Sequence, residues 1–236
     1  MPLVYFLVFL VVPKSHHKEH KEVHKGHYRF LQPQLMFDLM TLLNEIQEQL
    51  TLKSTREGKL ATQKFVPNSQ EVYGTRMPDI NELAKQYKAG GFELAKALWT
   101  SGAYEERILA AKILNKLCKK DPDQAIQFVE KFSNDISDWA VCDTIGMQSL
   151  KPVASTKEKE IFALAHRLSY SDNLWQRRLS LVLVEVYTKN IKLHSAIKVL
   201  VKKQEADKEY YVIKAVEWIN RNLNKHASHK PFEKAH

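Results

Sequence analysis

The stretch Ser137-Asp138-Trp139-Ala140-Val141-Cys142-Asp143-Thr144-Ile145-Gly146 contains one of four tryptophans whose spacing indicates the fold. Trp99, Trp139, Trp175 and Trp218 are separated by 40, 36 and 43 residues. These intervals are close to the roughly 40 to 47 residues of HEAT and armadillo units, which are small groups of helices. The spacing therefore predicts an all-α solenoid of HEAT-like repeats, in which neighbouring units bury their apolar faces against each other.

Helical periodicity extends from this stretch in both directions. Leucine and isoleucine recur every three or four positions from Gln34 onward, which predicts an amphipathic helix that ends near residues 54–58. Pro78 suits the first turn of a helix that ends before Gly90, and residues 67–78 are expected to form the loop before it. Further helices are expected at 92–100, 103–120, 122–133, 136–149, 156–169, 173–188, 191–203 and 207–224. No pair of strands is expected.

The chain is expected to have three segments, which are an irregular His/Lys-rich extension at 1–33, the repeat domain at 34–225 and a tail at 226–236. The apolar run 3–12 is shorter than the roughly 17 to 25 residues that cross a bilayer as a helix. No basic residue precedes the run and no small-residue cleavage site follows it, so we interpret it as part of the extension, with export as the alternative. His20, His24 and His27 have helical spacing, but no cysteine or carboxylate pair completes a metal site, and a solvated basic tail is expected.

The composition favours a polyanionic partner. The net charge is +9, and Cys118 and Cys142 are too few for a disulfide framework, so a reducing compartment and a cytoplasmic, nucleoid-associated monomer are expected. Basic side chains are expected to gather along one surface of the array, although each of them also suits an ordinary solvated helix face. The candidates are Lys112, Lys116, Lys119, Lys120, Arg177, Arg178, Lys202, Lys203, Lys214, Arg221 and Lys225.

Trp139 and Asp143 form the strongest candidate for chemistry. Four residues separate them, so a helix places the aromatic ring and the carboxylate on one side. A carboxylate among tryptophans and arginines on a basic protein suits a DNA substrate with a scissile glycosidic bond, where positive charge develops on the sugar. The alternative is structural, with Asp143 in an ion pair to an arginine and the tryptophans in packing contacts.

From about Val72 to Leu223, the chain resembles the DNA alkylation repair family of HEAT-like DNA glycosylases, of the AlkD type. Five motifs carry the resemblance through their order and spacing. They are Tyr73-Gly74-Thr75-Arg76-Met77-Pro78, Leu98-Trp99-Thr100-Ser101 with Glu105-Glu106-Arg107, Trp139 with Asp143, Trp175-Gln176-Arg177-Arg178, and Lys214-Ala215 with Trp218 and Arg221.

The resemblance implies excision of cationic alkylated purines, such as N3-methyladenine and N7-methylguanine, from duplex DNA. It implies that Asp143 is the catalytic aspartate, that Trp139 and Trp218 contact the deoxyribose backbone of the lesion, and that Arg178 holds a nearby phosphate. It also implies that the damaged base is not drawn into a pocket. Two positions depart from the family pattern, with Arg76 where glutamine is common and Ala140 where aspartate is usual.

The remaining candidates complete these expectations. Arg177, Arg221, Lys214 and Arg76 are candidate DNA contacts, while Trp99 and Trp175 are expected to pack within the array. No cofactor, metal or membrane is expected, because no nucleotide-binding, zinc-binding or hydrolase-triad pattern is found. Two other functions stay open: a catalytically silent binder of damaged or branched DNA, and a protein-binding helical scaffold.

Overall fold

The computed structural model describes residues 33–67 and 71–227, and these residues form eleven α-helices without a β-strand. The helices are α1 (Pro33–Leu52), α2 (Arg56–Phe65), α3 (Met77–Gln86), α4 (Gly91–Ser101), α5 (Tyr104–Leu117), α6 (Pro122–Phe132), α7 (Trp139–Thr144), α8 (Glu158–Leu168), α9 (Leu174–Val182), α10 (His194–Gln204) and α11 (Tyr210–Ala227). The predicted extension, with its apolar run and histidines, lies outside these residues except for Pro33, and so do residues 228–236 of the tail.

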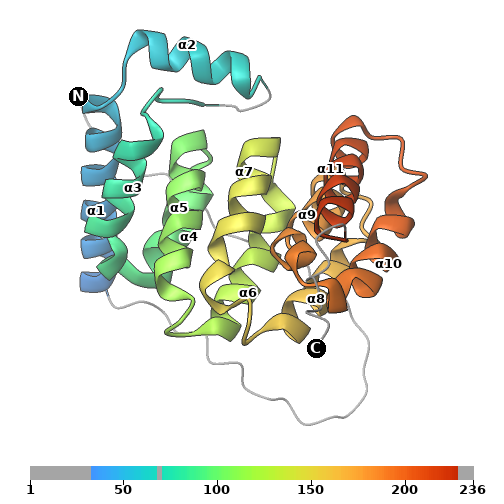
Figure 1. The fold of residues 1–236 in the computed structure, drawn as a ribbon. Helices are drawn as coiled ribbons and strands as arrows, with labels where there is room; N and C mark the ends of the chain where they lie inside the picture. The colour runs from blue at the N-terminus through green and yellow to red at the C-terminus, as the bar shows by residue number, and fades with distance from the viewer. Residues whose placement is uncertain (1–32, 68–70, 228–236) are drawn as a thin grey trace, which may run out of the picture. The chain divides into compact units, whose positions relative to one another are not determined.

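Apart from α2, the helices of residues 33–67 and 71–227 form two layers (Figure 1). We call α1, α4, α6, α8 and α10 the first layer, and α3, α5, α7, α9 and α11 the second layer. Within the second layer each helix packs on the next one along the chain, while α4 with α5, α8 with α9 and α10 with α11 form hairpins between the layers. This stacking of helix pairs confirms the predicted all-α repeat solenoid.

The tryptophans mark the repeat less regularly than their spacing suggests. Trp139, Trp175 and Trp218 lie in the second layer, but Trp99 lies in α4 of the first layer, so the four positions are not equivalent. Trp99 is 2% exposed and stacks on Phe132 with ring centroids 4.4 Å apart, and Trp175 is 9% exposed. These two rings therefore pack in the core, as expected.

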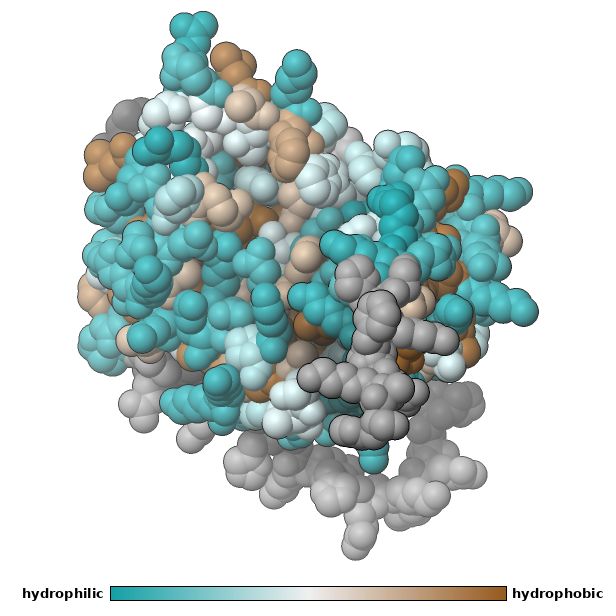
Figure 2. Space-filling view, viewed as in Figure 1, coloured by the Kyte–Doolittle hydropathy of each residue, from teal (hydrophilic) through white to brown (hydrophobic). Residues whose placement is uncertain are grey.

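Helix α2 differs from the sequence prediction, which has no element at residues 59–66. Thr55 caps it by accepting a hydrogen bond from the Gly58 amide at 2.9 Å, yet none of its residues is buried. Leu60 and Phe65 are exposed, and Figure 2 shows such apolar groups scattered over a largely hydrophilic face. A helix that buries so little lacks the strong apolar period by which sequence reveals helices.

The loop 71–76 anchors α2 through a close backbone contact. Gly74 has φ of +88°, and a Cβ there would lie 2.2 Å from the Lys59 amide nitrogen, so only glycine fits without displacement. Glu105 is fully buried and accepts hydrogen bonds from the amides of Tyr73 and Gly74 at 2.9 and 2.7 Å. The motifs 73–78 and 105–107 are thus joined in space, and they fix the position of α2.

Three expected helices have different limits or change helix type in the structure. The helix expected at 136–149 begins at Trp139, where Asp138 caps it, and it continues as a π-helical turn at Ile145–Ser149. The helix expected at 173–188 ends at Val182 and is followed by a 3₁₀ segment at Glu185–Lys189, while that expected at 103–120 ends at Leu117. Conversely, α1 begins at Pro33 and α11 ends at Ala227, just beyond the limits expected for the repeat domain. Helix ends depend on caps and tertiary contacts that periodicity does not show.

Candidate functional site

Helix α7 presents the predicted tryptophan and carboxylate together. Asp138 accepts a hydrogen bond from the Val141 amide at 2.8 Å, so the helix begins at Trp139. Asp143 follows one turn later, and a spacing of four places both side chains on the same side of the helix. The local arrangement agrees with the spacing argument made from the sequence.

Asp143 is held by Arg178 of α9. The Arg178 Nε and Nη2 atoms donate to the two carboxylate oxygens at 3.0 and 2.9 Å, and its Nη1 donates to the Tyr211 carbonyl of α11 at 2.6 Å. The Arg178 side chain is 7% exposed and that of Asp143 is 20% exposed. One guanidinium therefore links three consecutive helices of the second layer and fixes the orientation of the carboxylate.

Burial and the ion pair act on Asp143 in opposite directions. Burial raises the pKa of Asp143, the hydrogen bonds and charge of Arg178 lower it, and the nearby charge of Asp138 raises it, with a net rise. The thiol of the adjacent Cys142 is completely buried, which raises its pKa well above the usual value. Burial thus disfavours the reactive thiolate form of Cys142, which leaves the Asp143 carboxylate as the candidate for chemistry.

Trp139 contacts the C-terminal end of α2. Its Nε1 donates to the Phe65 carbonyl at 3.3 Å, and the two rings meet edge to face with centroids 4.6 Å apart. Sequence reasoning missed Phe65, because 74 residues separate it from Trp139 and α2 itself was not expected. The contact makes α2 a neighbour of the candidate site.

The candidates on α11 lie further along the second layer. Trp218 is half-buried against the core and is seven residues beyond Tyr211, which corresponds to about 10 Å along the helix. Lys214 pairs with Glu217 at 3.0 Å, and Arg221 is exposed. The start of α11 therefore joins Asp143 and Arg178 directly, whereas Trp218 lies about two turns away along α11 from that point.

The arginines expected at DNA have different surroundings. Arg177 is 17% exposed and is engaged by the protein, because its guanidinium bonds to Asp207 at 2.6 Å and to the carbonyls of Ser171 and Asp172. Arg178 is similarly engaged by Asp143 and α11. In contrast, 79% of the Arg76 side chain is exposed, with Asp79 at 3.8 Å. Of these three, Arg76 offers the most accessible charge.

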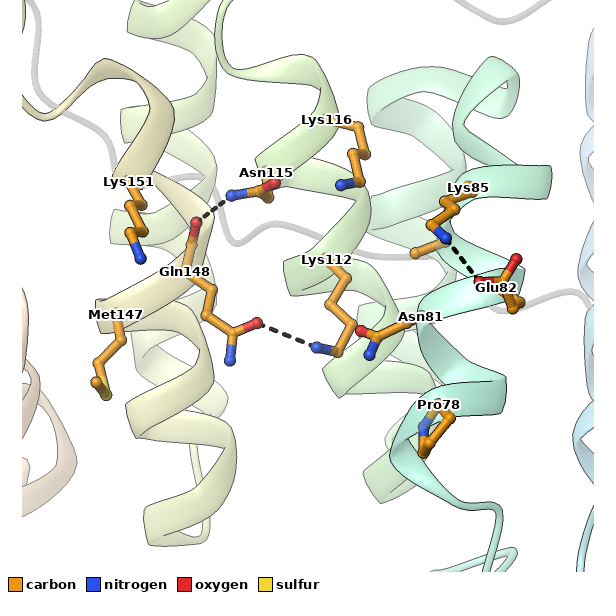
Figure 3. A pocket seen from close by; sticks show the side chains of 11 residues that line it. Pro78, Asn81, Glu82, Lys85, Lys112, Asn115, Lys116, Met147, Gln148 and Lys151 are labelled. Atoms are coloured by element: carbon orange, nitrogen blue, oxygen red, sulfur yellow. Dashed lines mark hydrogen bonds and ion pairs between the residues drawn. The ribbon is translucent and has the colours of Figure 1, made fainter.

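A pocket of about 670 Å³ opens beside the site on the second layer, and Figure 3 shows its side chains. Met147, four residues after Asp143, lies on its edge. Sequence reasoning named Lys112 and Lys116 as candidate basic residues but did not anticipate that a pocket contains them. Among residues 33–67 and 71–227, no cluster of three potential metal ligands and no helix apolar and long enough to cross a membrane is found.

Comparisons with known proteins agree with these features. A family model described as "DNA alkylation repair enzyme" matches residues 46–233. A solved structure described as "Predicted DNA alkylation repair enzyme from Enterococcus faecalis" has a TM-score of 0.65 and 14% sequence identity, over 75% of this chain and 86% of that chain. At this identity the likeness shows the fold alone. No curated protein matches the sequence.

Proposed function

Because this chain belongs to the DNA alkylation repair enzyme family, we propose that it is a DNA glycosylase that hydrolyses the N-glycosidic bond of cationic alkylated purines in duplex DNA. The observation that carries the proposal is the Asp143 carboxylate, which Arg178 holds in a fixed orientation one helical turn from Trp139. N3-methyladenine and N7-methylguanine are the proposed lesions.

Excision of a cationic base requires a negative charge near the sugar more than it requires a proton donor for the leaving base. When the bond between the sugar C1′ and the purine breaks, its electron pair neutralises the positive charge of the base, which leaves without being protonated. The sugar becomes an oxocarbenium-like cation, and the negative charge of Asp143 stabilises it. Water then adds to C1′ and gives its proton to Asp143. A neutral base leaves far more slowly, so selectivity follows from the charge of the lesion.

The surrounding side chains have positioning roles in this proposal. Arg178 keeps Asp143 ionised and oriented, which replaces the phosphate contact that the family resemblance implied for it. Trp139 and Trp218 present aromatic faces to the electron-poor sugar and its backbone. Arg76, Lys214 and Arg221 contact phosphates, which positions the duplex without reading its sequence. We propose that the protein acts as a cytoplasmic monomer without a cofactor.

A catalytically silent DNA-binding protein is the second candidate, and one observation favours it. Both oxygens of Asp143 accept hydrogen bonds from Arg178, as they would in a purely structural ion pair. In that case the fold and the basic surface bind damaged DNA without breaking a bond. The two candidates differ in whether a folded protein releases a cationic base.

The test is release of N7-methylguanine from duplex DNA in single turnovers. We expect Asp143→Asn to slow release on the order of 10²-fold or more while duplex affinity stays close to that of the wild type, since the carboxylate acts on charge that develops as the bond breaks. Asp172→Asn is the matched control, because Asp172 is exposed in the loop before α9. The backbone carbonyl of Asp172, and not its carboxylate, accepts the hydrogen bond from Arg177.

The outcome decides between the candidates. Release of N7-methylguanine by wild type, with an uncharged ethenoadenine retained, supports cationic selectivity. Wild-type rates in Asp143→Asn would contradict the proposed mechanism. Duplex binding by a folded wild type that releases no base would establish the silent DNA-binding function instead.

A further inference from the structure

The pocket beside the candidate site is unusually basic for a partly buried space. Its lining comes from α3, α5 and the end of the α7 region, and includes four lysines and one glutamate, a net charge of +3. Lys85 is paired with that glutamate, Glu82, at 2.6 Å, as Figure 3 shows. In the described part of the chain, Lys112, Lys116 and Lys151 form no ion pair with a carboxylate. Three lysines without an ion-pair partner among the described residues therefore line one pocket.

Lys112 is the most informative of these residues because it is only 8% exposed. Its ammonium group donates to Gln148 Oε1 at 3.0 Å, the single acceptor that it has among the described residues. An ammonium carries three N–H bonds, so two remain for another acceptor. Burial lowers the pKa of Lys112, and the charge of Lys116 lowers it further. The negative charge of an entering anion would stabilise the ammonium form against both effects.

The backbone around the pocket holds this arrangement in place. Gln148 lies in the π-helical turn 145–149, and its carbonyl accepts a hydrogen bond from Asn115 Nδ2 at 2.5 Å. Gly146 permits close packing of the turn on α9, since a Cβ there would lie 2.5 Å from Val182 Cγ1. The turn therefore directs the Gln148 side chain toward Lys112. π-Helical turns of this kind are frequent at functional sites.

We propose that this pocket, centred on Lys112 and Lys116, binds a backbone phosphate of the DNA strand that flanks the lesion. The inference rests on the proposed function. The pocket is open at the second layer, the same layer that presents Asp143, and its volume of about 670 Å³ accommodates a sugar-phosphate segment. A negatively charged sugar-phosphate segment suits both the positive charge of the pocket and its volume.

The position of the pocket predicts which phosphate it binds. Gln148 is five residues beyond Asp143, or about 7.5 Å along the helix, and α5 is a neighbouring helix about 9 Å across. The combined offset is roughly 12 Å. Because a strand advances about 3.4 Å per nucleotide along the duplex axis, the bound phosphate is expected at most about three to four nucleotides from the reacting sugar.

A phosphate-neutralisation scan tests this assignment. Duplexes with one lesion and a single methylphosphonate at successive positions are titrated against wild type, Lys112→Met, Lys116→Gln and the control Lys198→Gln, which removes an exposed charge from α10 in the first layer. We expect the methylphosphonate at the matching position to weaken wild-type binding on the order of tenfold at about 0.1 M salt. The same methylphosphonate should not weaken the binding of the two pocket variants any further.

The results separate this inference from the proposed function. If wild type binds duplexes and releases base, but no phosphate position couples to Lys112 or Lys116 more than to Lys198, the pocket assignment is wrong and the glycosylase proposal stands. If wild type binds no duplex, both are wrong. A thermal stabilisation by inorganic phosphate that the pocket variants lose, without coupling to any duplex position, would instead identify a site for a free anion. The exposed Lys116→Gln variant keeps the test valid if Lys112→Met does not fold.

Discussion

At the residue scale, the candidate site depends on one buried ion pair. The spacing of Trp139 and Asp143 predicted their shared helix face, because helical geometry is local. It did not predict that Arg178 grips Asp143, since 35 residues separate them and a sequence does not show which of many arginines a carboxylate meets. The same limit explains Arg177, whose bonds to Asp207 and two loop carbonyls give it a structural role that its motif did not reveal.

We expect Arg178→Ala to destabilise the protein by about 3 kcal/mol, because it leaves the largely buried Asp143 charge without its partner. Arg167→Ala is the matched control. Arg167 also grips a carboxylate with two bonds, those to Glu130 at 2.9 Å, but that pair is about half exposed and should contribute less than about 1 kcal/mol. Urea unfolding of both variants measures the difference in the free energy of unfolding. Equal losses would mean that the Asp143–Arg178 pair stabilises the fold no more than an exposed ion pair does.

The pH dependence of excision follows from the raised pKa of Asp143. In the proposed mechanism the ionised form of Asp143 is the active one, so the single-turnover rate should fall on acidification at a higher pH than an ordinary aspartate would give. The effect on folding has the opposite sign: ionised Asp143 destabilises the folded state above this raised pKa, and the cost disappears as pH falls through it. Arg178→Ala should move the acid limb of the rate profile upward. An acid limb unchanged by the loss of Arg178 would show that another group controls the profile.

At the element scale, α2 is the helix that the sequence did not predict, although it contacts Trp139 of the candidate site. Core-forming helices such as α5, α6 and α8 were predicted because their buried residues recur at helical spacing. Helix α2 buries no residue, and the π-helical turn depends on the contact between Gly146 and Val182, which lie on different helices. Both features are consequences of tertiary packing.

We expect Phe65→Ala to slow excision by roughly 2- to 10-fold, which corresponds to about 0.5–1.5 kcal/mol for an edge-to-face ring pair that positions Trp139. Leu60→Ala removes a similarly exposed apolar side chain from the same helix, 59% against 55%, and is the control. Single-turnover rates under saturating enzyme report the effect. Equal rates for the two variants would mean that α2 does not position Trp139.

The attachment of α2 can be tested at Gly74. Alanine at this position incurs roughly 1–2 kcal/mol for its left-handed backbone and a further 1–3 kcal/mol or so for the clash with Lys59. Gly102→Ala isolates the first contribution, because Gly102 has φ of +91°, close to that of Gly74, and its would-be Cβ would meet the Arg107 Nη2 atom only at an ordinary contact distance of 3.9 Å. Thermal unfolding should therefore show a clearly larger loss for Gly74→Ala. Losses of the same size would indicate that the crossing of α2 and the loop is not tight.

At the scale of the whole molecule, the repeat spacing predicted the solenoid correctly although Trp99 is in the other layer. The approximation succeeded because each unit contributes one helix to each layer, so residues in either layer recur at about the same interval. The spacing did not show which tryptophans lie in the core, because Trp175 shares the second layer with Trp139 and Trp218 and yet is buried. The basic pocket depended similarly on the juxtaposition of three helices.

The stability of a repeat array is approximately a sum over its internal interfaces. Trp99→Ala should therefore destabilise the molecule by roughly 3 to 5 kcal/mol, because it removes a buried ring stacked on Phe132 of the neighbouring unit. Phe37→Ala, at a ring that is 68% exposed, should change stability by about 0.5 kcal/mol at most. Excision per folded molecule should be unchanged in both, and a selective loss of activity in Trp99→Ala would give that ring a function beyond packing.

The Arg178 guanidinium also has a mechanical consequence. It bonds to α7 and to α11 at once while belonging to α9, so it bridges three successive units of the solenoid. Bending of the array between these units would lengthen one of the hydrogen bonds of Arg178 and change the orientation of the Asp143 carboxylate. The orientation of the proposed catalytic carboxylate is thus coupled to the packing of three successive units. In the proposed glycosylase, a duplex that deforms easily at a lesion would adapt to these units at a lower cost than a stiff intact duplex, so that flexibility would contribute to lesion recognition before any base is contacted.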